Sequence, residues 1–409
     1  MNPPRHAFHL LAKPTGATCN LDCTYCFFLS KDELYPGRST RMGDDVLRAY
    51  VTQLLEAQPD GEVNVAWQGG EPTLMGIDFF ERAVALAEAT KRPAQQLLHT
   101  IQTNGTLLDD AWVAFFARHR FLVGLSIDGP AEIHDRFRVT KNGRGTHAEV
   151  IRAWNLLRAA GVETNVLCSV SAANSAHGLE VYRYFRDELG AEHIQFIPIV
   201  ERATEATLEL AERGWSEQPG RRRILYTQSG SLTTSRSVTG EGYGRFLVDV
   251  FDEWVRNDVG QVYVQLFDVT LGNHLGLHSL CVHSPECGAA LAIEHNGDVY
   301  SCDHFVEPDH FLGNVMERPL AELVVEPQQV EFGRHKATSL PQQCRDCDVL
   351  FACHGGCPKD RFATTASGEP GLNHLCGGYL NFFRHSRSSF AEMARLLQAG
   401  RYADEIMTR

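Results

Sequence analysis

The cysteines are the residues of this 409-residue chain whose number and spacing most clearly indicate chemistry. Cys19, Cys23 and Cys26 form a CxxxCxxC pattern directly after a predicted strand. Three thiolates can hold three irons of a 4Fe-4S cluster and leave the fourth iron open to a substrate or cofactor. A zinc site is the alternative, but structural zinc takes four ligands and this spacing supplies three. The pattern therefore favours an iron-sulfur cluster with an open iron.

A second, denser group of cysteines lies in the last third of the chain. Its members are Cys281, Cys287, Cys302, Cys344, Cys347, Cys353, Cys357 and Cys376. Spacing alone does not distinguish two zinc sites from two 4Fe-4S clusters, since both use four thiolates. The one remaining cysteine, Cys168, lies within an apolar strand, where we expect a packed core thiol.

Composition and charge narrow the class of protein. Hydrophobic residues make up 43% and charged residues 22%, as in soluble globular proteins. The formal net charge of -13 argues against nucleic-acid binding and against attraction to an anionic membrane. No basic-then-apolar leader precedes Phe8, and no apolar run reaches about eighteen residues. We therefore expect a cytoplasmic protein whose cysteines serve as metal ligands rather than in disulfides.

Repeated strand-helix units must position the first cysteine loop. Strands are predicted near residues 7–12, 62–68, 97–103, 121–127, 163–170 and 193–199. Helical patterns lie between them near residues 44–57, 77–90, 109–118, 147–160 and 177–189. This alternation indicates a parallel sheet. Six units are too few for a closed eight-stranded barrel, so we expect an open, partial (β/α)6 TIM-like barrel with its active site at the carboxyl ends of the strands.

Polar motifs follow the predicted strands at the points where this architecture would use them. Cys19 follows the first strand, QGGE (68–71) the second, TNG (103–105) the third and DGP (128–130) the fourth. Because the carboxyl ends of parallel strands meet at one edge, we expect these motifs on one rim.

The chain divides into four predicted parts. Residues 1–242 form the catalytic core, with an inserted, exposed loop near 202–242 that is rich in polar residues and glycine. A connecting helical segment covers 243–280, with a helix over 243–257. The dense cysteine unit covers 281–380, and a C-terminal helix covers 381–409.

The loop CNLDCTYC (19–26) resembles the signature of the radical S-adenosylmethionine (SAM) superfamily. The resemblance implies that the open iron binds the amino and carboxylate groups of SAM. It also implies that an electron from the reduced cluster releases a 5'-deoxyadenosyl radical, which abstracts a hydrogen atom. Segment 68–71 resembles the GGEP motif of the superfamily, whose glycine turn approaches the amino acid end of the cofactor. Without the cysteine loop, that segment would indicate only a turn.

The later cysteines resemble the SPASM extension of radical SAM enzymes, in which a CxxCxxxxxCxxxC run is followed by a lone cysteine. The resemblance implies two interleaved ligand sets. One auxiliary cluster would take Cys281, Cys287, Cys302 and Cys357, and the other Cys344, Cys347, Cys353 and Cys376. Three 4Fe-4S clusters would then use eleven of the twelve cysteines. Full ligation of the auxiliary clusters favours electron transfer over substrate binding.

Nearly the whole chain is similar to the anaerobic sulfatase-maturating enzymes. The similarity rests on CNLDCTYC, QGGEPTL, QTNGTLL, FLVGLSIDGP, DVYSCDHF, FACHGGCPKDRF and GLNHLC. It implies oxidation of a cysteine or serine of a sulfatase to Cα-formylglycine (3-oxoalanine). It also implies two partners, an unfolded or nascent sulfatase polypeptide and a reductant such as flavodoxin or ferredoxin.

Five positions match residues that bind SAM in this family, namely Tyr25, Gly70, Ser126, Arg138 and Val200. Ordinary strand residues are the alternative for Ser126 and Val200, and a solvated charge is the alternative for Arg138.

Asp303, directly after Cys302, matches the family's proposed proton acceptor. After loss of a β-hydrogen, the substrate must lose a proton and an electron, and a carboxylate beside an auxiliary cluster could take that proton. The alternative is that Asp303 caps a turn. We expect a surface or packing role for His304.

Two other functions stay open at this point. One is a different SPASM peptide maturase, which forms thioether or carbon-carbon crosslinks. Such enzymes often carry a recognition domain before the first cysteine loop, and this chain reaches that loop by residue 19. The other is a binding module with three zinc sites, which metal analysis would distinguish.

Overall fold

Six parallel strands form the centre of one sheet in the computed structural model, which describes residues 7–37, 39–215 and 223–408. They are β1 (His9–Lys13), β2 (Gly61–Trp67), β3 (Gln95–Thr103), β4 (Leu122–Ser126), β5 (Thr164–Val170) and β6 (His193–Pro198). The strands lie side by side in chain order, each paired in parallel with the next. Within the described residues the two end strands of the sheet do not pair with each other. The predicted strands and the open, partial barrel are therefore confirmed.

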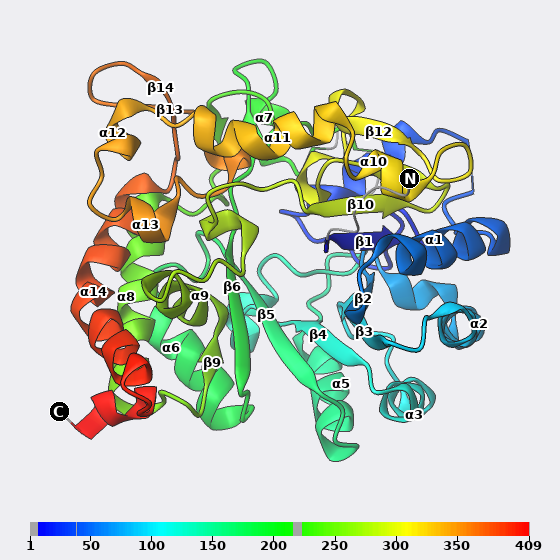
Figure 1. Cartoon of the computed structure of the whole chain (residues 1–409), viewed down its shortest axis with the longest axis horizontal. Helices are drawn as coiled ribbons and strands as arrows, with labels where there is room; N and C mark the ends of the chain where they lie inside the picture. The colour runs from blue at the N-terminus through cyan, green and yellow to red at the C-terminus, as the bar shows by residue number, and fades with distance from the viewer. Residues whose placement is uncertain (1–6, 38, 216–222, 409) are drawn as a thin grey trace.

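Helices connect these strands and cover their outer face (Figure 1). They are α1 (Asp44–Ala57), α2 (Ile77–Thr90), α3 (Asp110–His119), α5 (His147–Ala159) and α6 (Gly178–Arg183), the last continued by the π-helical turn η3 (Tyr184–Glu188). Each was predicted from its amphipathic pattern. At the start of α3, for example, the Asp109 carboxylate caps the helix by accepting hydrogen bonds from the backbone of Ala111 and Trp112, at 3.1 and 3.0 Å.

The main core lies between the sheet and these helices. Trp67 at the end of β2 is buried, with its ring edge-on to Tyr50 of α1 at 5.4 Å between centroids. Phe79 and Phe80 of α2 pack against the same indole, with centroids at 5.6 and 5.4 Å. This packing fixes the end of β2, from which the QGGE motif projects.

The sheet continues beyond the six strands on both sides, which the sequence analysis missed. On one side β9 (Tyr263–Val264) pairs in parallel with β6. On the other side β10 (Ala290–Glu294) pairs in parallel with β1, and β11 (Asp298–Tyr300) and β12 (Phe311–Asn314) follow it as antiparallel strands. The predicted cysteine unit therefore contributes strands to the same sheet as the core.

The inserted segment near 202–242 is not the exposed loop that its polar composition predicts. It contains β7 (Arg202–Ala203), α7 (Leu208–Glu212) and β8 (Leu232–Thr233), while its residues 216–222 lie outside the described residues. A small core of its own buries Ala203, Ala211, Trp215 and Tyr226. A few large side chains are enough to pack the segment against the barrel, because Phe27, which directly follows the first cysteine loop, contacts this small core.

Three long helices pack together at the other side of the molecule. They are α8 (Gly240–Asn257), which confirms the helix predicted over 243–257, α9 (Gln265–His274) and α14 (Cys376–Gln398). Figure 1 shows α14 running beside α8. The predicted C-terminal helix thus begins earlier than residue 381 and gives way to a 3-10 turn, η8 (Ala403–Thr408).

Short elements complete the described chain. They are α4 (Ala131–His134), α10 (Leu320–Leu323), α11 (Pro327–Thr338), α12 (Gln342–Arg345), α13 (Leu350–Cys353), β13 (Ala363–Thr364), β14 (Pro370–Leu372), η1 (Phe28–Leu34), η2 (Pro72–Met75), η4 (Cys281–His283), η5 (Asp303–Phe305), η6 (Pro308–His310) and η7 (Pro358–Asp360). Among the residues that the structure describes, none of the helices has the length and apolar character needed to cross a membrane.

Candidate active site

The first cysteine loop, residues 19–26, joins β1 to η1 at the carboxyl end of the strands. Its conformation is fixed by backbone hydrogen bonds to segment 137–140. Asp22 and Thr24 donate these bonds, at 2.8 and 3.0 Å, and an isolated bridge at Leu21 adds a further pairing. Segment 137–140 therefore holds the backbone of the loop in place.

The three thiols of this loop fit a cationic cluster. All twelve cysteines of the chain are free thiols. Burial raises the pKa of Cys23 to about 12, and the negative charge of Cys26 acts in the same direction. Burial also raises the pKa of Cys19, as do the charges of Glu71, Cys23 and Cys26. Three neighbouring thiolates in this position need nearby positive charge, which the irons of a cluster would provide.

The QGGE motif lies directly against this loop. The backbone N–H groups of Gly70 and Glu71 donate to the carbonyls of Gly16 and Thr18, both at 2.9 Å. A Cβ at position 70 would lie 2.1 Å from the carbonyl oxygen of Thr18, so only glycine fits there. This close approach of the two backbones explains why position 70 is a glycine. Contact of Gly70 with SAM stays a prediction.

Glu71 connects the second and third polar motifs. Its carboxylate is fully buried and accepts hydrogen bonds from Thr73, Thr103 and the backbone of Asn104, at 2.6 to 3.0 Å. Burial raises the pKa of Glu71, although these hydrogen bonds oppose the shift. Two of the four motifs predicted to share one rim are thus joined by one side chain.

Asp128 brings two of the predicted SAM-binding residues together. Its carboxylate accepts a hydrogen bond from the Tyr25 hydroxyl at 2.6 Å and forms an ion pair with Arg138 at 2.9 Å. It also accepts from the backbone of Ser169 at 2.9 Å. Arg138 is buried, so it is not the solvated charge that was the alternative. Asp128 was recognised in the DGP motif but not as the partner of these residues.

The other two predicted SAM-binding positions are less closely connected. Ser126 ends β4, is buried, and accepts a hydrogen bond from Gln102 at 3.1 Å. Val200 is buried just beyond the end of β6. Both lie at carboxyl ends of strands, and their role toward the cofactor stays a prediction.

Cys168 lies in β5 with no exposed surface, as expected for a core thiol. Its sulfur contacts the carbonyl of Asp128 at 3.5 Å and the amide of Asn174 at 3.6 Å. It therefore packs behind the Asp128 cluster.

The structure places several of the later cysteines near one another, and their division into two ligand sets stays a prediction. Burial raises the pKa of Cys302, and the charges of Cys357 and Cys281 raise it further. Burial likewise raises the pKa of Cys287 to about 11, with Cys281 again acting in the same direction. Cysteines far apart in sequence thus lie close enough to affect one another's ionisation.

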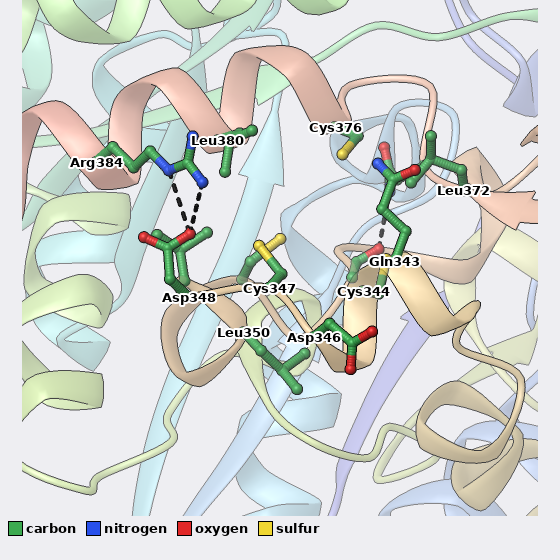
Figure 2. Close-up of a pocket in the computed structure, with 14 residues that line it drawn as sticks. Gln343, Cys344, Asp346, Cys347, Asp348, Leu350, Leu372, Cys376, Leu380 and Arg384 are labelled. Atoms are coloured by element: carbon green, nitrogen blue, oxygen red, sulfur yellow. Dashed lines mark hydrogen bonds and ion pairs between the residues drawn. The ribbon is translucent and has the colours of Figure 1, made fainter. Parts of the chain in front are cut away.

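The second set surrounds a cavity of about 470 Å³. Figure 2 shows Cys344, Cys347 and Cys376 around it, and Cys353 also lines it. Burial, followed by the charges of the other three thiols, raises the pKa of Cys353 to about 12. Four thiols that line one cavity could together hold a cluster. Within the described residues, three or more His, Cys, Asp or Glu side chains nowhere converge closely enough to hold a single metal ion.

Asp303 opens η5 directly after Cys302, and its carboxylate forms an ion pair with Lys13 at the end of β1. Lys13 is buried, donates a second hydrogen bond to Gln68 of the QGGE motif at 2.9 Å, and lies 4.6 Å from the ring centroid of Phe28. Burial alone would raise the pKa of Asp303, but Lys13 outweighs it and holds the pKa below its ordinary value. Asp303 is thus a half-buried carboxylate kept ionised between the two cysteine regions.

Lys13 and Lys31 are the charged residues here that the sequence analysis missed. Lys31 is buried, donates to the carbonyl of Tyr226 at 2.7 Å and lies 3.7 Å from the carboxylate of Glu307. Burial lowers its pKa to about 8. A lysine in an otherwise apolar predicted strand, such as Lys13 in HLLAK, was the signal that could have pointed to a buried partner.

Comparison with known proteins gives the family. The model of the radical SAM superfamily matches residues 14–171, and that of the SPASM iron-sulfur cluster-binding domain matches residues 286–348. A serine-type anaerobic sulfatase-maturating enzyme of Bacteroides thetaiotaomicron is 42% identical over 381 residues, which cover 92% of this chain and 89% of the relative. The chain belongs to the anaerobic sulfatase-maturating enzymes.

Further relatives of this family agree. A cysteine-type anaerobic sulfatase-maturating enzyme of Clostridium perfringens is 32% identical over 381 residues, covering 92% of this chain and 95% of the relative. The solved structure of anSMEcpe with AdoMet and a peptide bound has a TM-score of 0.80 at 30% identity, covering 95% of this chain and 99% of that one. As an anaerobic sulfatase-maturating enzyme, the protein is a radical SAM oxidoreductase that uses SAM and iron-sulfur clusters. The resemblance found in the sequence is confirmed.

Proposed function

We propose that this enzyme oxidises a cysteine or serine of a sulfatase polypeptide to Cα-formylglycine. The observation that carries the proposal is the ion pair between buried Lys13 and Asp303, a half-buried, ionised carboxylate next to the predicted cluster ligand Cys302. The matched relatives include both serine-type and cysteine-type enzymes, so both target residues stay in the proposal.

The oxidation removes two hydrogens from the substrate side chain, one as an atom from the β-carbon and one as a proton from sulfur or oxygen, together with one electron. When bound, SAM and the clusters supply the hydrogen-atom abstraction and the electron acceptor. Asp303 accepts the proton through its carboxylate, since Lys13 keeps it ionised in spite of burial. A serine substrate becomes the aldehyde directly, whereas a cysteine substrate becomes a thioaldehyde, which water hydrolyses to the aldehyde with release of hydrogen sulfide.

Three 4Fe-4S clusters are part of the proposal. The eleven cysteines at 19, 23 and 26 and in the two later sets would hold them. Iron analysis of the anaerobically purified protein tests the count. Cys357→Ala should lose about four iron atoms of about twelve, whereas Cys168→Ala, which removes the core thiol, should keep all of them. Equal iron in both variants would contradict the assignment of Cys357.

We further propose a cytoplasmic enzyme that acts on an unfolded or nascent sulfatase and is reduced by a carrier such as flavodoxin or ferredoxin. Twelve cysteines without a disulfide favour a reducing compartment. An extended substrate suits the chemistry, because the target residue must reach a half-buried carboxylate.

Mass spectrometry of a sulfatase-derived peptide tests the function. The peptide carries a Cys-x-Pro-x-Arg or Ser-x-Pro-x-Arg core and is incubated anaerobically with reconstituted enzyme, dithionite and SAM. We expect conversion of the target residue to formylglycine together with 5'-deoxyadenosine. Formation of 5'-deoxyadenosine with every tested sulfatase peptide unmodified would overturn sulfatase maturation and direct the search to crosslinked peptides.

A further inference from the structure

A short strap, defined as residues 223–228, crosses from the first cysteine loop to the segment after Cys302. The backbone N–H of Tyr226 donates to the Ser30 hydroxyl at 2.9 Å, next to the loop. Gln228 donates to the Glu307 carboxylate at 2.8 Å and to the carbonyl of His304 at 3.2 Å. The strap therefore contacts both cysteine regions, although it belongs to the segment whose composition predicted an exposed loop.

Arg223 begins the strap, and its guanidinium lies on the first cysteine loop. It donates to the backbone carbonyls of Cys26 and Cys23, at 3.0 and 3.3 Å. It also pairs with the carboxylate of Asp22 at 2.6 Å. The Arg223 side chain is 9% exposed, whereas that of Asp22 is 37% exposed, so water screens the carboxylate more than the guanidinium.

In this contact, the planar and permanently charged guanidinium of Arg223 binds the backbone of two predicted cluster ligands, Cys23 and Cys26. Two hydrogen bonds from one guanidinium fix the directions of both carbonyls, and hence the peptide geometry of the residues that carry the thiols.

The same charge should affect reduction of a cluster bound there. One-electron reduction adds a negative charge, so a fixed, poorly screened cation nearby stabilises the reduced form and makes the potential less negative. The Asp22 carboxylate should make the potential more negative. Its effect is weaker because the carboxylate is more exposed to solvent.

We propose that Arg223 is a positioning residue for the cluster at Cys19, Cys23 and Cys26, holding the ligand loop through two carbonyls and easing reduction of the cluster by its charge. This role of Arg223 does not depend on which peptide is oxidised. The same role would apply if the enzyme catalysed another radical SAM reaction.

The test is a redox titration of the full-length, reconstituted enzyme followed by electron paramagnetic resonance, in which the signal that changes on addition of SAM reports the first cluster. Arg223→Met should shift the potential of this signal to more negative values and should lose iron to a chelator faster than wild type. Arg223→Lys, which keeps the charge without the fork, should stay closer to wild type in potential. Asp22→Asn should shift the potential in the opposite direction, to less negative values.

A control variant separates this effect from a general disturbance of the insert. Arg213→Met removes an exposed arginine of the same insert, paired with Glu209 at 2.8 Å, and should leave potential and iron retention unchanged. If Arg223→Met does not fold, as judged by circular dichroism, the sign of the shift in Asp22→Asn decides. Wild-type potential and iron retention in both Arg223→Met and Asp22→Asn would overturn the proposal.

Discussion

Lys13, the last residue of β1, forms an ion pair with Asp303, the residue that follows Cys302. The lysine is almost completely buried and the carboxylate is partly covered, with side-chain exposures of 1% and 18%. A buried charge of this kind is tolerated only with a partner, and Gln68 supplies a second acceptor to the ammonium group. The pair therefore links the strand before the first cysteine loop to the residue proposed as the proton acceptor.

Replacing Lys13 by methionine should change the pH dependence of the reaction. Burial raises the pKa of Asp303 and the ammonium group of Lys13 lowers it. Without that ammonium group the pKa of Asp303 should therefore rise. A protonated carboxylate cannot accept a proton, so formylglycine yield should begin to fall at a higher pH than in wild type as the solution is acidified. The ratio of formylglycine to 5'-deoxyadenosine, measured across pH, reports this. Lys91→Met, which removes a surface lysine paired with Glu88 at 2.7 Å, is the matched control. An unchanged acid limb in Lys13→Met would refute the role of the pair.

Asp303→Asn should separate radical formation from product formation. The amide keeps the size of the side chain but cannot accept the proton, and such a general base contributes about 10² to 10⁴ in rate. We expect wild-type iron content and 5'-deoxyadenosine formation with a loss of formylglycine of about 10²-fold or more. Asp309→Asn, an exposed carboxylate in the following turn, should behave as wild type. Full formylglycine yield in Asp303→Asn would remove this residue from the mechanism.

Gly70→Ala should disturb the contact between the QGGE motif and the first cysteine loop. The added methyl group would lie 2.1 Å from the carbonyl oxygen of Thr18, so the backbones must separate. Overpacking of this kind costs about 1–3 kcal/mol, and we expect weaker SAM binding in equilibrium dialysis. Gly43→Ala has nothing within 4 Å of the new methyl group and is the control. Equal SAM affinity in both variants would show that the close approach is unimportant for the cofactor.

Asp128→Asn should destabilise the fold through Arg138. The substitution leaves a buried guanidinium without its countercharge, which costs about 3–5 kcal/mol. The free energy of unfolding in urea measures the loss. Asp44→Asn removes the partner of Arg82 in an exposed pair of 3.2 Å and should cost less than about 1 kcal/mol. Similar losses of unfolding free energy in the two variants would mean that the buried pair of Asp128 and Arg138 contributes no more to stability than the exposed pair of Asp44 and Arg82.

Local patterns were sufficient to predict the six central strands and the helices between them. Apolar runs such as FLVGLS at β4 and amphipathic runs such as that of α3 carry their periodicity within a few residues. The rim motifs followed, since the carboxyl ends of parallel strands meet at one edge. The family was likewise within reach of the sequence, because cysteine spacing is a local property.

Long-range pairing was outside the reach of these patterns. β9 has two residues and β11 three, too few for a period, and they are strands only because a sheet edge is available to them. The burial of the inserted segment depends on Trp215 and Tyr226 meeting Phe27, which lies far away in sequence. The partners of Lys13 and Arg223 could not be predicted for the same reason. The residues close to a buried charge in sequence do not show which distant residue carries the opposite charge.

The parallel pairing of β1 with β10 has a consequence for biosynthesis. β1 is translated long before the strand that completes its other edge, β10, which starts at Ala290. Until that strand has been made, one edge of β1 is open to incorrect partners. Correct pairing at this edge, and with it the meeting of Lys13 and Asp303, must therefore wait until β10 and the residues after it have been translated. We expect chaperone dependence and slow maturation of the newly made enzyme to originate at this seam.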